Sequence, residues 1–176
     1  MLSLTTVAAV SLMLAQQPAP ASPDDFSRMT PEQLKSGIQN AHPAAYYVLA
    51  TKLLASGQKD DAAFWYYAGQ LRFRFHLAAN QGLDPSGDPA LFASFQEVVG
   101  RPVNEYAWGD LPALHATLER VLAWDKQNKN GFTSTQKHAQ AWNDTRAGLQ
   151  KLIAYIDGHA AEIKQQRKAN GLENRK

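Results

Sequence analysis

Residues 43–72, PAAYYVLATKLLASGQKDDAAFWYYAGQLR, indicate the fold of this chain more directly than any other stretch. Pro43 is suited to opening a helix, and Gly57 supplies a tight turn before a second helix. That second helix carries four consecutive aromatic residues at positions 64–67. Four consecutive positions point in nearly every direction around a helix axis. We therefore expect this helix either to be contacted on several sides or to present an aromatic patch to a partner.

Helix start signals recur along the rest of the chain. Thr30, Asp88 and Asp110 each stand one or two residues before a proline, and such an N-cap next to a proline is typical of a helix start. Thr30 with Gln33, and Thr133 with Gln136, each offer a capping box. Outside the first hairpin, the predicted helices cover residues 31–37, 88–99, 111–126 and 133–168.

Two stretches, 71–77 and 100–109, lack the apolar spacing of a helix. Residues 71–77, LRFRFHL, alternate as a β-strand would, but the chain offers no convincing partner strand. We therefore expect the aromatic helix to continue to about Asn80. Residues 100–109, GRPVNEYAWG, show no period and are expected to be irregular.

The predicted C-terminal helix has a clear apolar seam. Trp142, Leu149, Ile156 and Ile163 recur every seven residues, which lays a stripe along one side of a helix. We expect this helix to pack lengthwise over the others with its basic end projecting. The predicted fold class is thus all-α: a compact bundle of antiparallel helix pairs with a long C-terminal helix.

The hairpin at 43–72 resembles a single tetratricopeptide-type helical repeat. In such repeats large and small residues interlock between two antiparallel helices, and a small residue stands at the turn. The matching positions are Tyr46, Leu49, Ala50, Leu53, Gly57, Ala62, Tyr66 and Gly69. The resemblance implies a tightly packed hairpin, and the absence of a second copy favours a compact bundle over a repeat array.

The N-terminal residues have the composition of an export signal. An uncharged apolar run at 2–14 is too short to span a bilayer as a helix, and small residues follow it. The predicted organisation is a secretory signal peptide at 1–21, a flexible mature N-terminus at 22–29, one helical domain at 30–168 and a basic tail at 169–176. The expected location is the bacterial periplasm or the exterior, with no stable membrane span in the mature protein.

Composition excludes several function classes. The chain of 176 residues has no cysteine, so disulfides, thiolate metal sites and a cysteine nucleophile are absent. Its formal net charge is only +2, and the basic excess lies at the C-terminal end, so nucleic acid is not an expected partner. Neither a GxSxG motif nor a P-loop nor a dinucleotide fingerprint occurs, and no cofactor or metal is predicted.

A non-catalytic protein that binds a protein or peptide partner is the function that the sequence favours. An immunity or inhibitor protein against an envelope toxin or hydrolase is one alternative, and an envelope scaffold is another. A third is a metal-dependent hydrolase built around His138, His159 and Glu162, because His159 and Glu162 share a helix face.

Exposed aromatic and arginine side chains are the predicted contacts for the partner, since tyrosine, tryptophan and arginine are enriched at binding hot spots. Most aromatic residues of the 64–67 block are instead expected to fill the core of the bundle. For Tyr106 and Trp108 the alternative to binding is that they anchor the 100–109 connection. The predicted partner-binding residues are Tyr47, Arg72, Arg74, Arg101, Tyr106 and Trp108.

Overall fold

The computed structural model describes residues 23–176, and every regular element within them is helical, which confirms the predicted all-α class. The predicted signal peptide lies outside this range. The α-helices are α1 (Pro23–Arg28), α2 (Pro31–Gly37), α3 (Ala44–Ala55), α4 (Lys59–Ala79), α5 (Asp88–Phe95), α6 (Arg101–Ala107), α7 (Leu111–Gln127), α8 (Ala139–Gly158) and α9 (Ala160–Ala169). A 3₁₀ turn, η1 (Ile38–Asn40), follows α2, and a π-helical turn, η2 (Gln96–Gly100), joins α5 to α6. None of the helices in this range is both long and apolar enough to cross a membrane.

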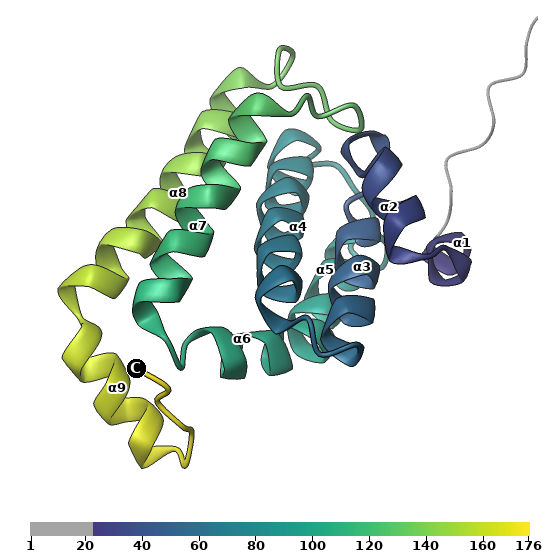
Figure 1. Cartoon of the computed structure of the whole chain (residues 1–176). Helices are drawn as coiled ribbons and strands as arrows, with labels where there is room; N and C mark the ends of the chain where they lie inside the picture. Colours follow the sequence, from purple (N-terminus) through teal and green to yellow (C-terminus); the bar gives the residue numbers. More distant parts are fainter. Residues whose placement is uncertain (1–22) are drawn as a thin grey trace, which may run out of the picture.

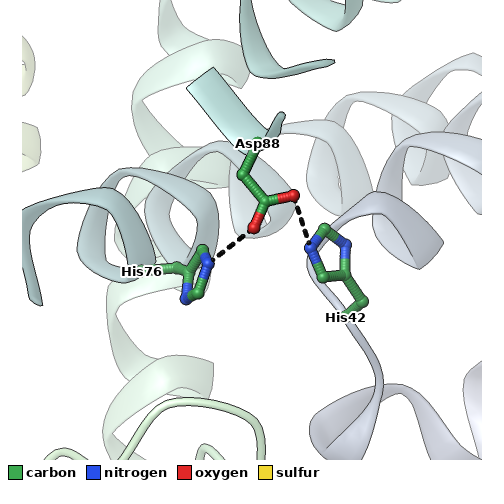
Figure 2. Close-up of side chains that lie close together, drawn as sticks. All are labelled: His42, His76 and Asp88. Carbon is green, nitrogen blue, oxygen red and sulfur yellow. Dashed lines mark hydrogen bonds and ion pairs between the residues drawn. The ribbon is translucent and has the colours of Figure 1, made fainter. Parts of the chain in front are cut away.

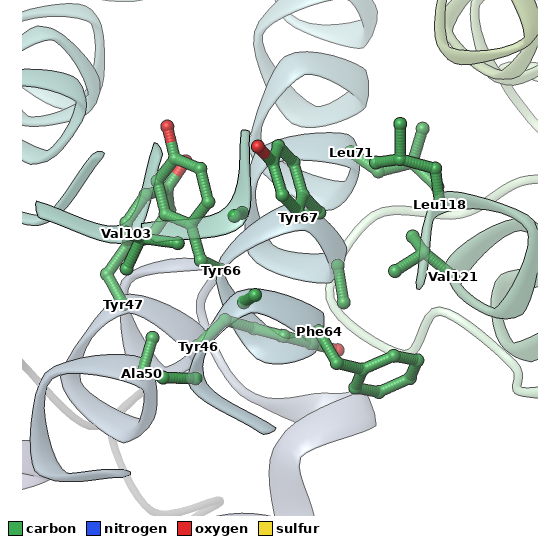
Figure 3. Packing of buried hydrophobic residues seen from close by; sticks show 14 of the residues in the cluster. Tyr46, Tyr47, Ala50, Phe64, Tyr66, Tyr67, Leu71, Val103, Leu118 and Val121 are labelled. Atoms are coloured by element: carbon green, nitrogen blue, oxygen red, sulfur yellow. The ribbon is translucent and has the colours of Figure 1, made fainter. Parts of the chain in front are cut away.

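Helix α4 is the centre of the bundle. Figure 1 shows α3 packed on one side of it and the α7–α8 pair on the other. Phe64, Tyr66 and Tyr67 are buried and Trp65 is partly buried, so the aromatic block faces several neighbours at once (Figure 3). The four aromatic residues therefore form the core of the bundle and do not present an exposed strip.

The α3–α4 hairpin is tightly packed, as its glycines predict. Gly57 adopts a φ of 79° at the turn, a conformation that other residues rarely take. A Cβ atom at Gly69 would lie only 2.6 Å from the Cβ of Tyr46, so only glycine lets the helices approach this closely. The similarity to a tetratricopeptide-type repeat stays an interpretation of this hairpin.

The alternating stretch at 71–77 belongs to α4, which ends at Ala79, so the expected helix is confirmed. Its alternation has a helical explanation, because α4 is covered on many sides. Arg72 and His76 are buried beside the apolar residues, whereas Arg74 points to solvent.

Residues 101–107 form helix α6, so the irregular segment expected at 100–109 is corrected. Pro102 stands in the first turn of α6, where its missing N–H does not break a helical hydrogen bond. Val103 and Ala107 lie four residues apart and are both buried, which gives this short helix an inner face.

The C-terminal region also differs from the expected long, projecting helix. The helix breaks at His159, directly after Gly158, and continues as α9. Gly171, with a φ of 72°, then turns the chain back, and the N–H of Arg175 donates to the carbonyl of Gly109 at 2.6 Å. Buried Arg167 donates to the carbonyl of Glu105 at 2.9 Å, so the basic end is anchored to the bundle.

The segment expected to be flexible before residue 30 contains helix α1. Phe26 of α1 is 3% exposed and belongs to the hydrophobic core, which holds the short helix against the bundle. A capping box at Thr30 then starts α2, as predicted.

Candidate functional site

A groove between α4 and α8 has a cavity volume of about 790 Å³. Its α4 wall consists of Gln70, Leu71, Arg74, Ala78 and, just past the helix, Gln81. Its α8 wall consists of Gln140, Ala141, Asp144, Thr145, Gly148, Leu149 and Leu152. The spacings of three and four residues within each set place the side chains of each wall on one face of its helix.

The groove has an apolar floor and a polar rim. Leu71 and Leu149 are buried and Leu152 is half-buried, so leucine side chains form the floor. Exposed charged groups stand on both walls, Arg74 on α4 and Asp144 on α8. Such a combination of apolar surface and a few polar groups is typical of a ligand site.

Gly148 leaves the α8 wall open. A Cβ atom built at this glycine would meet no atom within 4 Å, so the space above it is free of other parts of the described chain. The carbonyl of Ala141 accepts the hydroxyl hydrogen of Thr145 at 2.7 Å, so this hydroxyl already donates within α8. Small, satisfied residues therefore line this part of the wall.

The charged groups of the rim are not paired with one another. The guanidinium of Arg74 lies 5.6 Å from the ring centroid of Phe92, and no ion pair of Arg74 occurs within residues 23–176. Asp144 accepts a hydrogen bond from the Gln140 side chain at 2.9 Å. Both charges remain exposed and available to a ligand.

Buried tyrosine hydroxyls hold the Gln70 side of the groove in place. The Gln70 amide donates to Gln96 Oε1 at 2.7 Å, and this same oxygen accepts the Tyr66 hydroxyl at 2.9 Å. Gln96 in turn donates to the Tyr47 hydroxyl at 2.9 Å. Burial raises the pKa of both tyrosines, so their hydroxyls stay neutral and act as structural hydrogen-bonding groups.

A second polar cluster joins His42, His76 and Asp88 (Figure 2). His42 precedes α3, His76 lies near the end of α4, and Asp88 begins α5. Nε2 of His42 lies 3.2 Å from one carboxylate oxygen of Asp88, and Nε2 of His76 lies 2.9 Å from the other. One ligand-type atom from each residue falls within 4.8 Å of the others, so the cluster has to be tested as a metal site.

The hydrogen bonds on the far side of the rings assign the protons. The N–H of Ala44 donates to Nδ1 of His42 at 3.1 Å, so this nitrogen carries no proton. The side-chain amide of Asn80 donates to the His76 carbonyl at 2.8 Å, which orients its N–H₂ group, and lies 3.2 Å from Nδ1 of His76. Both rings therefore carry the proton on Nε2 and donate it to Asp88.

This proton pattern does not suit a metal ion. A neutral histidine that binds a metal through Nε2 must carry its proton on Nδ1, where the Ala44 N–H already points at His42. The cluster is instead a carboxylate held by two N–H donors. It ties together the starts of α3 and α5 and the end of α4, and Thr133 joins from the α7–α8 connection through a 3.0 Å contact with His76.

Burial lowers the pKa of His42 in spite of the neighbouring Asp88 carboxylate. For Asp88, burial raises the pKa, but the hydrogen bonds and charges of the two histidines together bring it below its ordinary value. The bonded state of the cluster is thus the one with neutral His42 and ionised Asp88.

The metal centre expected for the hydrolase alternative, at His138, His159 and Glu162, is not formed. His138 is the N-cap of α8 and His159 its C-cap, and a helix of 20 residues separates them by about 30 Å. They cannot share one ion with Glu162.

The predicted partner-binding residues divide into four groups, the last of which is Tyr106 and Trp108. Tyr47 and Arg72 are 0% and 2% exposed, so they cannot form a surface. Arg101 is exposed and pairs with Glu97 one turn away. Arg74 alone lines the groove.

Arg72 is held by the bundle and not offered to a partner. Its Nε lies 2.7 Å from Asp125 Oδ1, and its Nη2 donates to the Asn128 carbonyl at 2.7 Å. Arg146 Nη1 lies 2.7 Å from the other oxygen of Asp125, so two arginines share one buried carboxylate. Arg72 therefore belongs to a structural ion cluster.

Tyr106 and Trp108 are only partly exposed because other parts of the chain cover them. The guanidinium of Arg175 lies 3.8 Å from the Tyr106 ring centroid, and Trp108 Nε1 donates to the Tyr67 hydroxyl at 3.1 Å. Because Tyr47 and Arg72 are buried, they do not form a surface together with this segment.

The α8 wall is the part of the candidate site that the sequence left unassigned. Its one local signal is Gly148, a glycine inside an otherwise strong helical pattern. Comparison of the chain with protein-family models, with curated proteins and with solved structures returned no match. The candidate site therefore stands on its geometry alone.

Proposed function

We propose that this protein is a non-catalytic module that binds a segment of a protein or peptide partner in the α4–α8 groove. The observation that carries the proposal is the groove itself, with its volume of about 790 Å³, its leucine floor and its two exposed charges. Concave sites with an apolar base and a few convergent polar groups are the usual places for ligands.

The chemistry of the lining supports binding over catalysis. Its ionisable side chains are Arg74 and Asp144, and its hydroxyl group, on Thr145, is already bonded to a carbonyl. An activated nucleophile needs a base within hydrogen-bond reach, and the groove-lining residues contain no histidine to supply one. The groove is built to hold a ligand.

We further propose that binding takes place in the bacterial periplasm or outside the cell. Support comes from residues 1–21, whose apolar run followed by small residues has the pattern of an export signal. A domain with no cysteine suits this location only if its core is sufficient by itself, and the aromatic core around α4 fulfils that condition.

A single substitution can fill the groove without disturbing the fold. Gly148→Leu places a side chain in the open space above α8, and leucine is a better helix former than glycine. Gly158→Leu is the matched control, since Gly158 is also an exposed α8 glycine with no atom near its Cβ position but lies outside the groove lining. Both variants should melt at or above the wild-type temperature.

The test is retention of partners from an envelope extract of the source cells on the immobilised protein. We expect proteins that the wild type and Gly158→Leu retain equally and that Gly148→Leu retains at least tenfold less. Identical retention by all three proteins would place the interface elsewhere, and no specific retention by the wild type would contradict a binding function.

A further inference from the structure

We propose that the occupant of the groove is an amphipathic α-helix of about three turns, with an acidic residue on the flank that faces α4 and a basic residue on the flank that faces α8. This inference rests on the proposed binding function and adds the form and charge of the ligand. It follows from the hydrogen-bonding capacity, the dimensions and the charges of the groove.

Hydrogen-bonding capacity argues against an extended peptide. Both walls are helices, whose backbone groups are already paired within α4 and α8, so the walls offer a ligand mainly side chains. Two of the three glutamines on the rim are engaged: Gln70 donates to Gln96, and Gln140 donates to Asp144. An extended peptide would therefore leave its backbone N–H and carbonyl groups unpaired over the leucine floor. A helical peptide does not, because its backbone groups form hydrogen bonds within the helix.

The dimensions fit a short helix. The α8 wall runs from residue 140 to 152, about 18 Å of helix axis, and the α4 wall runs from residue 70 to the helix end at 79, about 14 Å, with Gln81 just beyond it. About 12 helical residues cover the length of the α8 wall. Ala78, Ala141 and Gly148 are small, so a third helix can approach both walls to ordinary helix-packing distance.

The charges give the occupant an orientation. Arg74 stands exposed on the α4 wall without an ion pair among the described residues, and Asp144 stands exposed on the α8 wall. A helix with its apolar face on Leu71, Leu149 and Leu152 has one flank beside each wall. A carboxylate on the first flank and an ammonium or guanidinium group on the second would complement both charges.

Two displayed libraries of 14-residue peptides test the form of the ligand against the purified protein. One has apolar residues at helical spacing, i, i+3, i+4, i+7 and i+11, and random residues elsewhere. The other has the same apolar positions but carries proline at the two central positions, which prevents a continuous helix. We expect binders from the first library only, with affinity reduced at least tenfold by Gly148→Leu and unchanged by Gly158→Leu.

The outcomes separate the two proposals. Binders that are sensitive to Gly148→Leu but come only from the proline library would overturn the helical occupant and leave the binding function standing. If neither library yields a binder sensitive to Gly148→Leu, both proposals are contradicted.

Charge reversal tests the orientation. Arg74→Glu should weaken the best helical peptide three- to tenfold, and replacing the acidic flank residue of that peptide with lysine should restore the affinity. Asp144→Lys with the basic flank residue changed to glutamate is the matching pair. Unchanged affinity in Arg74→Glu, or no recovery with the reversed peptide, would overturn the charge assignment.

Discussion

In the part of the chain that the structure describes, charged side chains are exposed and without ion pairs in the α4–α8 groove, whereas they are buried and paired in the ion cluster around Asp125. In the cluster, Arg72 and Arg146 each approach one oxygen of Asp125 at 2.7 Å, and the Asp125 side chain is 2% exposed. In the groove, Arg74 and Asp144 are exposed, and neither has an ion pair among the described residues. The same residue types are thus buried as ion pairs in one place and exposed to solvent in the other, and the proposed function uses the exposed ones.

This contrast explains why composition alone misassigns Arg72. Arg72 and Arg74 are two residues apart on α4 and are chemically identical, yet one is buried against α7 and the other points into the groove. Positions two apart on a helix differ in direction by about 200°, so neighbouring arginines reach different surroundings.

Removing the shared carboxylate of the ion cluster should have the largest effect. Asp125→Ala leaves Arg72 and Arg146 without their buried counter-charge and takes an acceptor from Trp142, so we expect a loss of about 3–5 kcal/mol in the free energy of unfolding. Urea denaturation measures it. Asp144→Ala in the groove is the control and should change stability by less than about 0.5 kcal/mol. Equal losses of unfolding free energy in the two variants would show that the buried cluster contributes no more to stability than the exposed groove charge.

Alanine substitution should lower the free energy of unfolding at Gly69, which is closely packed, and raise it at Gly148, which is not. Gly69→Ala puts a methyl group 2.6 Å from the Tyr46 Cβ, and we expect it to destabilise the protein by about 2 kcal/mol. Gly148→Ala meets no atom and should stabilise it by about 0.5–1 kcal/mol through helix propensity. Thermal unfolding of both variants decides the matter, and a destabilised Gly148→Ala would show that the groove wall is not free.

The histidine–aspartate cluster should contribute less than the ion cluster because Asp88 is partly exposed. Asp88→Asn removes the charge that accepts from His42 and His76, and we expect a loss of about 1.5 kcal/mol at pH 7, measured by urea denaturation. Glu162→Gln, on exposed α9, is the control with the same change of charge. If added Zn²⁺ raises the melting temperature of the wild type but not of Asp88→Asn, the assignment of the protons to Nε2 is wrong.

The smallest expected effect is a change in pH dependence. The pKa of His42 is lowered in the folded protein, so below its ordinary value of 6.5 the unfolded chain takes up a proton first and stability falls. The pKa of Asp88 is also lowered, so its contribution is present above 3.8 and is lost at more acidic pH.

His42→Asn should therefore flatten the fall in stability just below pH 6.5, because asparagine can still accept the Ala44 N–H but does not titrate. Denaturant midpoints between pH 7 and 5 measure the slope. A slope as steep as that of the wild type would show that His42 does not cause it.

Features encoded within a few residues were predictable. The Thr30 capping box forms as expected, the turn at Gly57 has the left-handed backbone that glycine permits, and α4 continues through the alternating stretch to Ala79. The aromatic core was predictable too, because four consecutive bulky residues require neighbours on every side.

Features that depend on distant segments were not predictable. The anchoring of the basic end requires Arg167 to meet the Glu105 carbonyl, 62 residues earlier in the chain, and the histidine cluster joins residues 46 positions apart. Local patterns carry no information about such pairs. For the same reason the sequence did not show that Tyr47 and Arg72 are buried and so removed from any binding surface, whereas Arg74 lines the groove.

Local sequence is sufficient to specify the helical class, the positions of most helix starts, the tight α3–α4 hairpin and the aromatic centre. Each of these depends on backbone preference, capping or side-chain volume within one or two helical turns. Only the tertiary structure decided which charged side chains are paired and which remain free. The groove exists because α8 crosses α4 with Gly148 and small neighbours over a leucine floor, and a charge becomes structural or available according to what the opposite element places beside it.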